Sequence, residues 1–169
     1  MKIVTALVFY KNTSATTVEA KIPIRIKEVS KEYAADLFPL IRKMPQKKQQ
    51  QFIQRFNKGD RCYMAFSGMI PCHYSWIREK GTIGMHEIKR RFKIKNKDAW
   101  IFDCTTNSNY RGLSIYTKVI SYITELLISN GYSNVYISTL KSNKASIRGI
   151  EKAGFSFEGK INHLKLSAK

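Results

Sequence analysis

The sequence predicts a single-domain protein of the α/β (α+β) class, in which helices cover a sheet. Three observations lead to this class. Residues 99–104 form a short apolar run rich in aromatic and β-branched residues, which is typical of a buried strand. The segment after it, up to Asn130, has apolar residues at every third or fourth position, which is typical of a helix. Residues 132–152 repeat the order of strand and helix, and residues 61–78 have the pattern of a hairpin.

The N-terminal half is predicted to contain two strands, two helices and that hairpin. Residues 1–10 alternate enough to be an edge strand, followed by a loop to residue 20, and residues 21–29 alternate as a second strand. Ser30 is suited to cap a short helix. Pro45 is suited to begin another over Gln46–Phe56. Pro71 predicts either a bulge or an interrupted strand within the hairpin.

The C-terminal half is predicted to be built around the helix that Asn130 and Gly131 end. Residues 81–98 are a basic stretch to which no element is assigned. A second helix is predicted over 144–152, and one or two strands over 155–166 with a break at Glu158-Gly159. The apolar stripe of the long helix consists of Leu113, Tyr116, Val119, Ile120, Ile123, Leu126 and Leu127.

The loop Tyr110-Arg111-Gly112 joins the predicted strand to the long helix. Such a connection aims free backbone N–H groups and the positive end of the helix dipole at one point, which suits a phosphate. An ordinary crossover helix would have the same pattern. Neither GxGxxG nor GxxxxGK[ST] is present, so the common nucleotide-binding fingerprints are excluded.

Three segments resemble the GNAT superfamily of acyl-CoA-dependent N-acyltransferases: residues 110–116 (YRGLSIY), Asn143, and residues 150–155 (IEKAGF). The resemblance is strongest from Trp100 to Phe157. It implies a GNAT fold, with a mixed, mostly antiparallel sheet of about six to seven strands flanked by about four helices. It also implies an N-acetyltransferase that uses acetyl-CoA as co-substrate, without a metal. The amine would attack the thioester directly in a ternary complex.

The same resemblance implies where acyl-CoA would bind. The acyl chain and pantetheine would lie along Cys104, Thr105 and Thr106, and Asn143 would bind the pantetheine arm. In the family pattern Gln/Arg-x-x-Gly-x-Gly/Ala, Arg111 fits, whereas Ser114 and Tyr116 replace small residues. Asn143 is equally suited to cap the helix after it, and Tyr116 to lie in the core. The pyrophosphate would be held by Arg111, Gly112, Leu113, Ser114, Ile115 and Tyr116.

Candidate catalytic groups are fewer. Asp103 lies in an apolar run, where an unpaired carboxylate is costly, so it either has a partner or lines a cavity. It is the candidate base, and structural pairing is the alternative. Where the family often has a tyrosine that protonates the leaving thiolate, this chain has Ile150. Tyr116 and Ser146 are candidate substitutes, unless no acid is used. His73, His86 and Glu87 are either acceptor-side or packing residues.

The charge leaves other classes of function open. The chain has 30 Lys and Arg against 12 Asp and Glu, a net charge of +18. Such a charge favours anionic partners, acyl-CoA included, although a biased genome composition would produce it too. A nucleic-acid-binding module would use residues 89–97 on phosphates and Tyr63, Tyr74 or Trp76 for stacking. A protein that binds acyl-CoA without turnover is a further alternative.

The expected partners are acyl-CoA and an amine, either a small molecule or a peptide, and the charge favours an anionic acceptor. Nucleic acid is the less favoured partner, and a homodimer is left open. The three cysteines, Cys62, Cys72 and Cys104, lack metal-ligand spacing and are expected to be reduced core thiols. No apolar run has membrane-spanning length. The cytoplasm is therefore the expected location.

Overall fold

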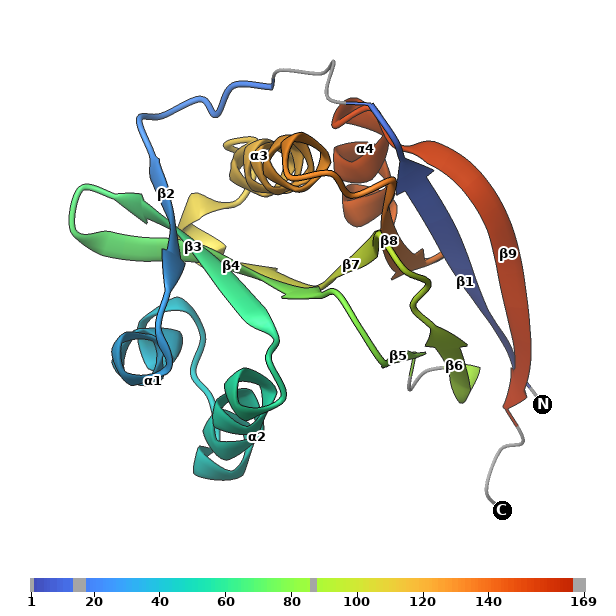
Figure 1. The fold of residues 1–169 in the computed structure, drawn as a ribbon. Helices are drawn as coiled ribbons and strands as arrows, with labels where there is room; N and C mark the ends of the chain where they lie inside the picture. Colours follow the sequence, from blue (N-terminus) through green and yellow to red (C-terminus); the bar gives the residue numbers. More distant parts are fainter. Residues whose placement is uncertain (1, 14–17, 86–87, 166–169) are drawn as a thin grey trace.

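The computed structural model describes residues 2–13, 18–85 and 88–165, which build a seven-stranded mixed sheet (Figure 1). The order of strands across the sheet is β2-β3-β4-β7-β8-β1-β9, and only β7 and β8 pair in parallel. This is the mixed, mostly antiparallel sheet that the family resemblance implies. The strands are β1 (Lys2–Lys11), β2 (Arg25–Val29), β3 (Arg61–Ser67), β4 (Ile70–Arg78), β7 (Asp98–Thr106), β8 (Asn134–Leu140) and β9 (Ser156–Lys165).

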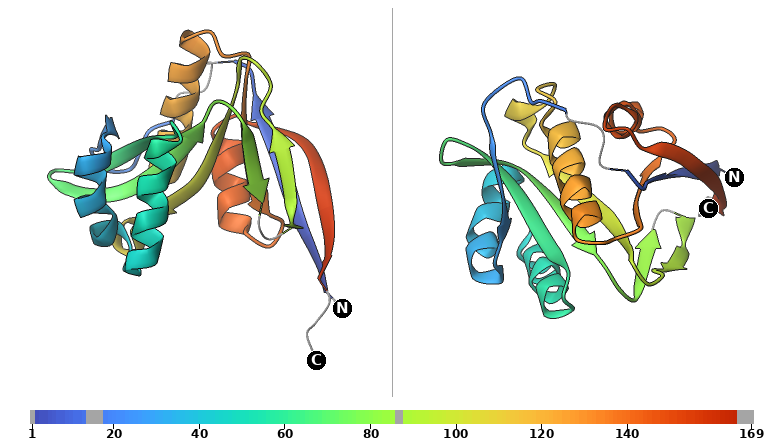
Figure 2. Two further views of the ribbon diagram at one scale, coloured as in Figure 1. Left: turned by 60° about the horizontal axis from the view of Figure 1, so that its bottom comes forward. Right: turned by 45° about the horizontal axis from the view of Figure 1, so that its top comes forward.

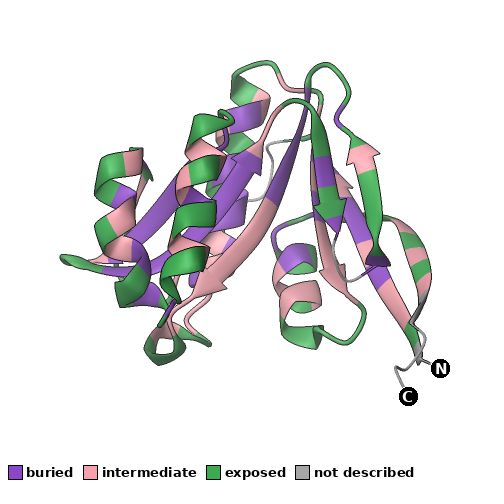
Figure 3. Ribbon diagram, turned by 90° about the horizontal axis from the view of Figure 1, so that it is seen from below, coloured by how far each residue is buried: buried purple, intermediate pink, exposed green. Residues whose placement is uncertain are grey.

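Helices cover both faces of the sheet, two on each side (Figures 1 and 2). α1 (Lys31–Ile41) and α2 (Gln46–Asn57) lie on one face, and α3 (Ile115–Ser129) and α4 (Lys144–Lys152) lie on the other. Each face has its own hydrophobic core. Phe38 and Phe52 pack on Trp76 on the first side, and Ile120 and Ile123 pack on Ile101 on the second. The buried residues follow the central strands and the inner sides of the helices (Figure 3).

The helices begin and end where their sequences predict. The Ser30 hydroxyl oxygen accepts the N–H of Tyr33 at 3.4 Å and caps α1, and α2 follows Pro45 directly. α3 ends before Gly131, whose φ of 86° is the left-handed conformation that glycine favours. The hairpin of β3 and β4 has its bulge at Pro71, since Ala65 pairs with His73 but Phe66 pairs with Pro71.

The N-terminal strand is not at the edge of the sheet, which corrects the prediction for residues 1–10. β1 pairs with β8 on one side and β9 on the other, and β9 forms the edge. The physical reason is burial on both faces: Phe9 lies in the core under α3, whereas Val8 packs on Trp100 on the opposite face. The predicted break at Glu158-Gly159 is a bulge in β9, because Val8 pairs with Gly159 and Phe9 with Phe157.

Two further differences concern residues 21–29 and 81–98. The strand predicted over 21–29 begins only at Arg25, after Pro23, which has no N–H to pair. The basic stretch forms a separate two-stranded sheet of β5 (Thr82–Met85) and β6 (Arg90–Lys93). This small sheet covers Trp100, whose ring stacks between Phe92 at 5.7 Å and Tyr136 at 5.3 Å.

Replacing Lys11 by Met is expected to destabilise the fold, because Lys11 joins β1 to the end of α4. Lys11 is 4% exposed, and its Nζ donates to the Ala153 carbonyl at 2.7 Å. The variant leaves a carbonyl at a helix C-terminus without its charged partner. The expected loss of unfolding free energy in urea is about 1–3 kcal/mol. Lys160→Met on exposed β9 is the control, and an equal loss in both variants would contradict this role.

Candidate active site

The two parallel strands at the centre of the sheet separate along half of their length. β7 pairs with β8 only from Asp98↔Asn134 to Ile101↔Ile137. Beyond this point residues 102–106 pair with β4 alone and residues 138–140 with β1 alone. Each strand therefore presents an unpaired edge to the other, with free backbone N–H and C=O groups in the interior of the sheet. An extended ligand with amide groups can fill this gap as an added strand.

A bulge in β7 lies where this gap begins. Trp76 pairs with Phe102 and Tyr74 pairs with Thr105, so Asp103 and Cys104 both lie opposite Ser75. Asp103 has a φ of 44°, a left-handed conformation in which Asp is one of the few tolerated residues. Bulges redirect side chains. Here Asp103 reaches α2, on the same side as its neighbour Phe102, whereas Cys104 packs in the core under α3.

The N-terminus of α3 lies one short loop after β7 and has no side-chain cap. Ser114 occupies the cap position with a φ of 59°, and its hydroxyl bonds no backbone N–H of the helix. The first-turn amides have no acceptor within the helix, and Arg111 beside them is exposed. Helix N-termini with free amides are places where anions bind in proteins. The left-handed φ of Ser114 gives the physical reason why the family pattern has glycine at this position.

α4 is capped, in contrast to α3. The Asn143 side-chain oxygen accepts the N–H of Ser146 at 3.1 Å, so the capping role predicted for Asn143 is confirmed. Tyr116 packs against this helix: a Cβ at Gly149 would lie only 2.7 Å from a ring carbon of Tyr116. The Tyr116 hydroxyl lies 3.2 Å from the Ser146 hydroxyl, which brings together the two predicted substitutes for Ile150. Ile150 itself is buried in the core.

A buried polar network lies beneath Tyr116 on the α3 side of β7. His73 is fully buried, with Nδ1 2.8 Å from the Thr106 hydroxyl and Nε2 2.8 Å from the Ser75 hydroxyl. Burial lowers the pKa of His73 to about 3, so the imidazole is neutral near neutral pH. Burial also raises the pKa of Cys104 to about 12 and that of Tyr116 well above its usual value. These groups are therefore uncharged around the strand end.

The opposite face of β7 carries a charged pair. Arg55 of α2 donates from Nη1 to Asp103 Oδ2 at 2.7 Å, and both side chains are about one-fifth exposed, at 23% and 22%. The guanidinium carbon also lies 4.5, 5.1 and 5.0 Å from the ring centres of Phe52, Trp76 and Phe102. Of the two alternatives predicted for Asp103, a partner or a cavity, the structure shows a partner, Arg55, at a position on α2 that no sequence motif marks.

The remaining sequence candidates are less central. His73 is a buried packing residue, and His86 and Glu87 lie outside the described residues. Tyr63, Tyr74 and Trp76 are at most 2% exposed, which rules out the base-stacking role considered for them. Cys62, Cys72 and Cys104 are free thiols. Among residues 2–13, 18–85 and 88–165, no group of three or more His, Cys, Asp and Glu side chains could hold a metal ion.

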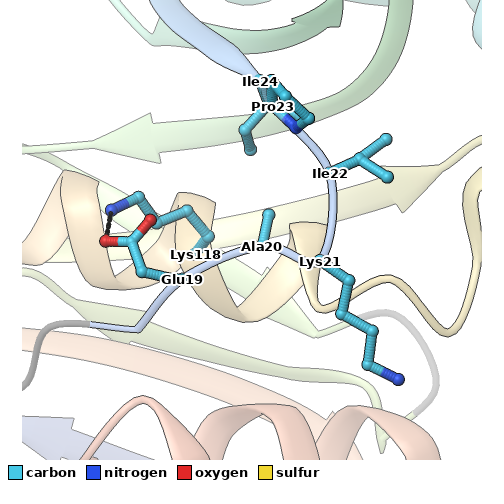
Figure 4. Close-up of a pocket in the computed structure, with 7 residues that line it drawn as sticks. All are labelled: Glu19, Ala20, Lys21, Ile22, Pro23, Ile24 and Lys118. Atoms are coloured by element: carbon cyan, nitrogen blue, oxygen red, sulfur yellow. Dashed lines mark hydrogen bonds and ion pairs between the residues drawn. The ribbon is translucent and has the colours of Figure 1, made fainter.

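A pocket of about 400 Å³ lies beside α3 but contains none of the predicted acyl-CoA residues (Figure 4). It is lined by residues 19–24 and Lys118, with an ion pair of 2.7 Å between Glu19 and Lys118. The N–H of Lys21 donates to the Leu113 carbonyl at 2.9 Å. Residues 19–24 therefore contact both α3 and the loop before it.

A strand gap with free backbone groups, next to an uncapped helix and an exposed arginine, suits a long ligand with amides at one end and phosphates at the other. Acyl-CoA is a ligand of this kind, with pantetheine amides at one end and phosphates at the other. The model of the GNAT family of acetyltransferases matches residues 34–155. The chain belongs to the GNAT acetyltransferase family, whose general co-substrate is acetyl-CoA.

Solved structures agree in fold. A GNAT-family acetyltransferase from Colwellia psychrerythraea matches with a TM-score of 0.67 and 16% identity, over 96% of this chain and 56% of that one. An aminoglycoside acetyltransferase from an uncultured soil metagenomic sample, in complex with sisomicin, matches with a TM-score of 0.60 and 12% identity, over 86% and 97%. The Escherichia coli ribosomal-protein-S18-alanine N-acetyltransferase matches with a TM-score of 0.58 and 12% identity, over 79% and 78%.

The chain spans between 50% and 63% of the length of the first five structures that it matches. No curated protein matches its sequence. Within the described part of the chain, no helix has the length and apolar character that crossing a membrane requires.

Proposed function

We propose that the chain transfers an acetyl or other short acyl group from acyl-CoA to the primary amine of an acceptor, with both substrates bound together. The observation that carries this proposal is the gap between β7 and β8 next to the uncapped N-terminus of α3. Free backbone groups of residues 102–106 bind the amides of pantetheine, and Arg111 with the first-turn amides of α3 binds the pyrophosphate.

The two faces of β7 have different proposed roles, one toward the thioester and one toward the acceptor amine. The uncharged network of His73, Cys104 and Tyr116 faces the thioester side and gives the strand end a low polarity. Asp103 faces the other side and accepts a proton from the acceptor's ammonium group. The amine nitrogen then bonds to the acyl carbon and releases its second proton to solvent, the carbon–sulfur bond breaks, and the thiolate of CoA leaves with its electron pair. Backbone N–H groups at the strand edge stabilise the oxyanion.

Titration calorimetry with acetyl-CoA tests the binding step. The wild type is expected to bind one equivalent saturably, and Arg111→Ala to bind about 10- to 100-fold more weakly, because a charged hydrogen bond contributes about 1.5–3 kcal/mol. Arg91→Ala, on exposed β6, removes the same charge far from the site and serves as the control. Absence of saturable binding at millimolar acetyl-CoA would contradict the proposal.

Tyr116→Phe and Ser146→Ala are each expected to lower turnover less than about tenfold, against about 10²- to 10⁴-fold for a true general acid. Burial raises the pKa of Tyr116, and a CoA thiol with a pKa of about 8.5 leaves acceptably as the anion. Steady-state thiol release at saturating acetyl-CoA measures the effect. A loss of a hundredfold in either variant, with unchanged acetyl-CoA affinity, would identify that residue as the acid.

A further inference from the structure

On the face of β7 that is turned to α2, an arginine lies beside the carboxylate proposed as the base, although proton transfer needs the carboxylate alone. Arg55 can donate five hydrogen bonds, yet among the described contacts it makes one, from Nη1 to Asp103. Its side chain is 23% exposed, so solvent reaches the remaining N–H groups. Oδ1 of Asp103 likewise has no partner among the described residues, since only Oδ2 is bonded. A free anionic oxygen and free cationic donors therefore lie side by side.

The position of Arg55 is fixed before any ligand arrives. Three aromatic rings, of Phe52, Trp76 and Phe102, surround the guanidinium at 4.5, 5.1 and 5.0 Å, and the bond to Asp103 holds one of its ends. A side chain held in this way loses little conformational freedom when it binds a ligand. Such preorganisation is a property of recognition sites, and a solvated surface arginine lacks it.

A second arginine, Arg42, and the buried hydroxyl of Tyr74 lie on the same face of the sheet as Arg55. Arg42 ends α1 and is exposed, and the side-chain nitrogen of Asn107 donates to the Leu40 carbonyl at 3.1 Å, which holds the end of α1 against the end of β7. The charges of Asp103 and Arg42 both act on Tyr74, although burial is the main cause that raises its pKa to about 12. The Tyr74 hydroxyl is fully buried, and it lies close enough to the side chains of Thr105 and Arg42 for both to counteract part of this rise in pKa.

Arg55 pairs with Asp103, and Arg42 acts on the same buried Tyr74 as Asp103 does, so two guanidinium groups and one carboxylate lie around Tyr74 and their summed charge is positive. An acceptor with only an amine would engage Asp103 and leave the free donors of Arg55 without a ligand. An anionic group next to that amine would satisfy both, because Arg binds carboxylates and phosphates through paired N–H groups. The Tyr74 hydroxyl, which lies between Arg42 and the strand that carries Asp103, adds one more polar group in the same region.

Building on the proposed function, we propose that the acceptor carries an anionic group beside the amine that is acylated, as in an α-amino acid. The ammonium group binds Oδ1 of Asp103, and the anion binds Arg55 and Arg42. Arg55 thereby selects the acceptor and at the same time orients the carboxylate that takes the proton.

A three-arm acceptor panel tests this inference, with acetyl-CoA held at saturation. The first arm contains amino acids, the second the same amino acids as their amides, and the third aminoalkyl phosphates. The amino acids are expected to exceed their amides in kcat/KM by about 10- to 100-fold, the range of a charged hydrogen bond. If the aminoalkyl phosphates have a higher kcat/KM than both other arms, the anionic group of the acceptor is a phosphate, and the inference of an anionic acceptor still holds.

Arg55→Gln is expected to bring the ratio between the first two arms close to one, even though looser positioning of Asp103 lowers both rates. Arg42→Gln is expected to reduce this ratio less than Arg55→Gln does. If Arg55→Gln fails to fold, Arg42→Gln is used as the test variant instead. Arg91→Gln on β6 removes the same charge at a distance and is expected to preserve the ratio. A ratio that Arg55→Gln leaves unchanged would overturn the role of Arg55.

Failure of this inference is distinguishable from failure of the proposed function. Equal use of amino acids and amides, or preference for the amides, overturns the acceptor class while acyl transfer itself stands. Binding of acetyl-CoA without turnover in any arm, while other primary amines are acetylated, also overturns the acceptor class. Absence of acetyl-CoA binding by calorimetry refutes the proposed function instead.

Discussion

Lowering the pH from 6.5 to 5 is expected to reduce the unfolding free energy by about 2 kcal/mol through His73 alone. Burial lowers the pKa of His73 to about 3, whereas an unfolded chain binds that proton at about 6.5. Between these values the unfolded state carries one proton more than the native state, so stability rises with pH and is lost as the pH falls. Over the whole interval the loss reaches about 5 kcal/mol.

Urea unfolding between pH 5 and 7 isolates this effect, because carboxylates titrate below that window. His73→Gln is expected to lose the pH slope, since glutamine is neutral throughout, whereas His163→Gln on β9 is expected to keep it. A slope that persists in His73→Gln would assign the acid sensitivity to another group. An NMR titration of the wild type provides a check without substitution: the His73 resonances of the native protein should not titrate above pH 4.

Asp103→Asn is expected to lower turnover by about 10²- to 10⁴-fold, the range for loss of a positioned general base. Asparagine tolerates a left-handed φ as well as aspartate does, so the bulge at φ 44° persists and the substitution removes only the charge. Affinity for acetyl-CoA should be unchanged, because the Asp103 side chain faces α2, whereas the site proposed for the ligand's phosphates is at α3. The loss then appears in kcat and kcat/KM alike, which is the sign of an interaction made in the transition state.

Asp36→Asn is the matched control for this prediction, since Asp36 is an exposed carboxylate on α1. Thiol release at saturating acetyl-CoA and acceptor measures both variants. Turnover of Asp103→Asn within threefold of the wild type would make Asp103 a structural partner of Arg55 and remove it from the mechanism.

Local patterns were sufficient to predict most of the elements. Capping by Ser30 and Asn143, the start of α2 after Pro45 and the stop of α3 at Gly131 depend on neighbouring residues only, so the sequence predicts them correctly. The place of β1 does not have this property. Its alternation predicts that a strand forms. Its two edges, however, pair with β8 and β9, which lie more than a hundred residues away in the sequence.

The candidate site likewise combines features that depend on neighbouring residues with features that depend on distant ones. Arg111 and Ser114 are predicted as site residues because the family pattern has fixed spacing there, and their role stays a prediction. The left-handed φ of Ser114 explains the glycine that the pattern expects. The need of Asp103 for a partner follows from its apolar surroundings. That the partner is Arg55 depends on a bulge in β7 and on the packing of α2, and neither leaves a local signal.

The most direct test of the account is product analysis with isotope-labelled acetyl-CoA and a mixture of primary amines, read by mass spectrometry. The account predicts that the labelled acetyl group appears on an amine in an amide bond, in amounts equal to the thiol released, and that Asp103→Asn abolishes most of it. Saturable binding of acetyl-CoA with no labelled amide, or thiol release that matches hydrolysis alone, would contradict acyl transfer to an amine.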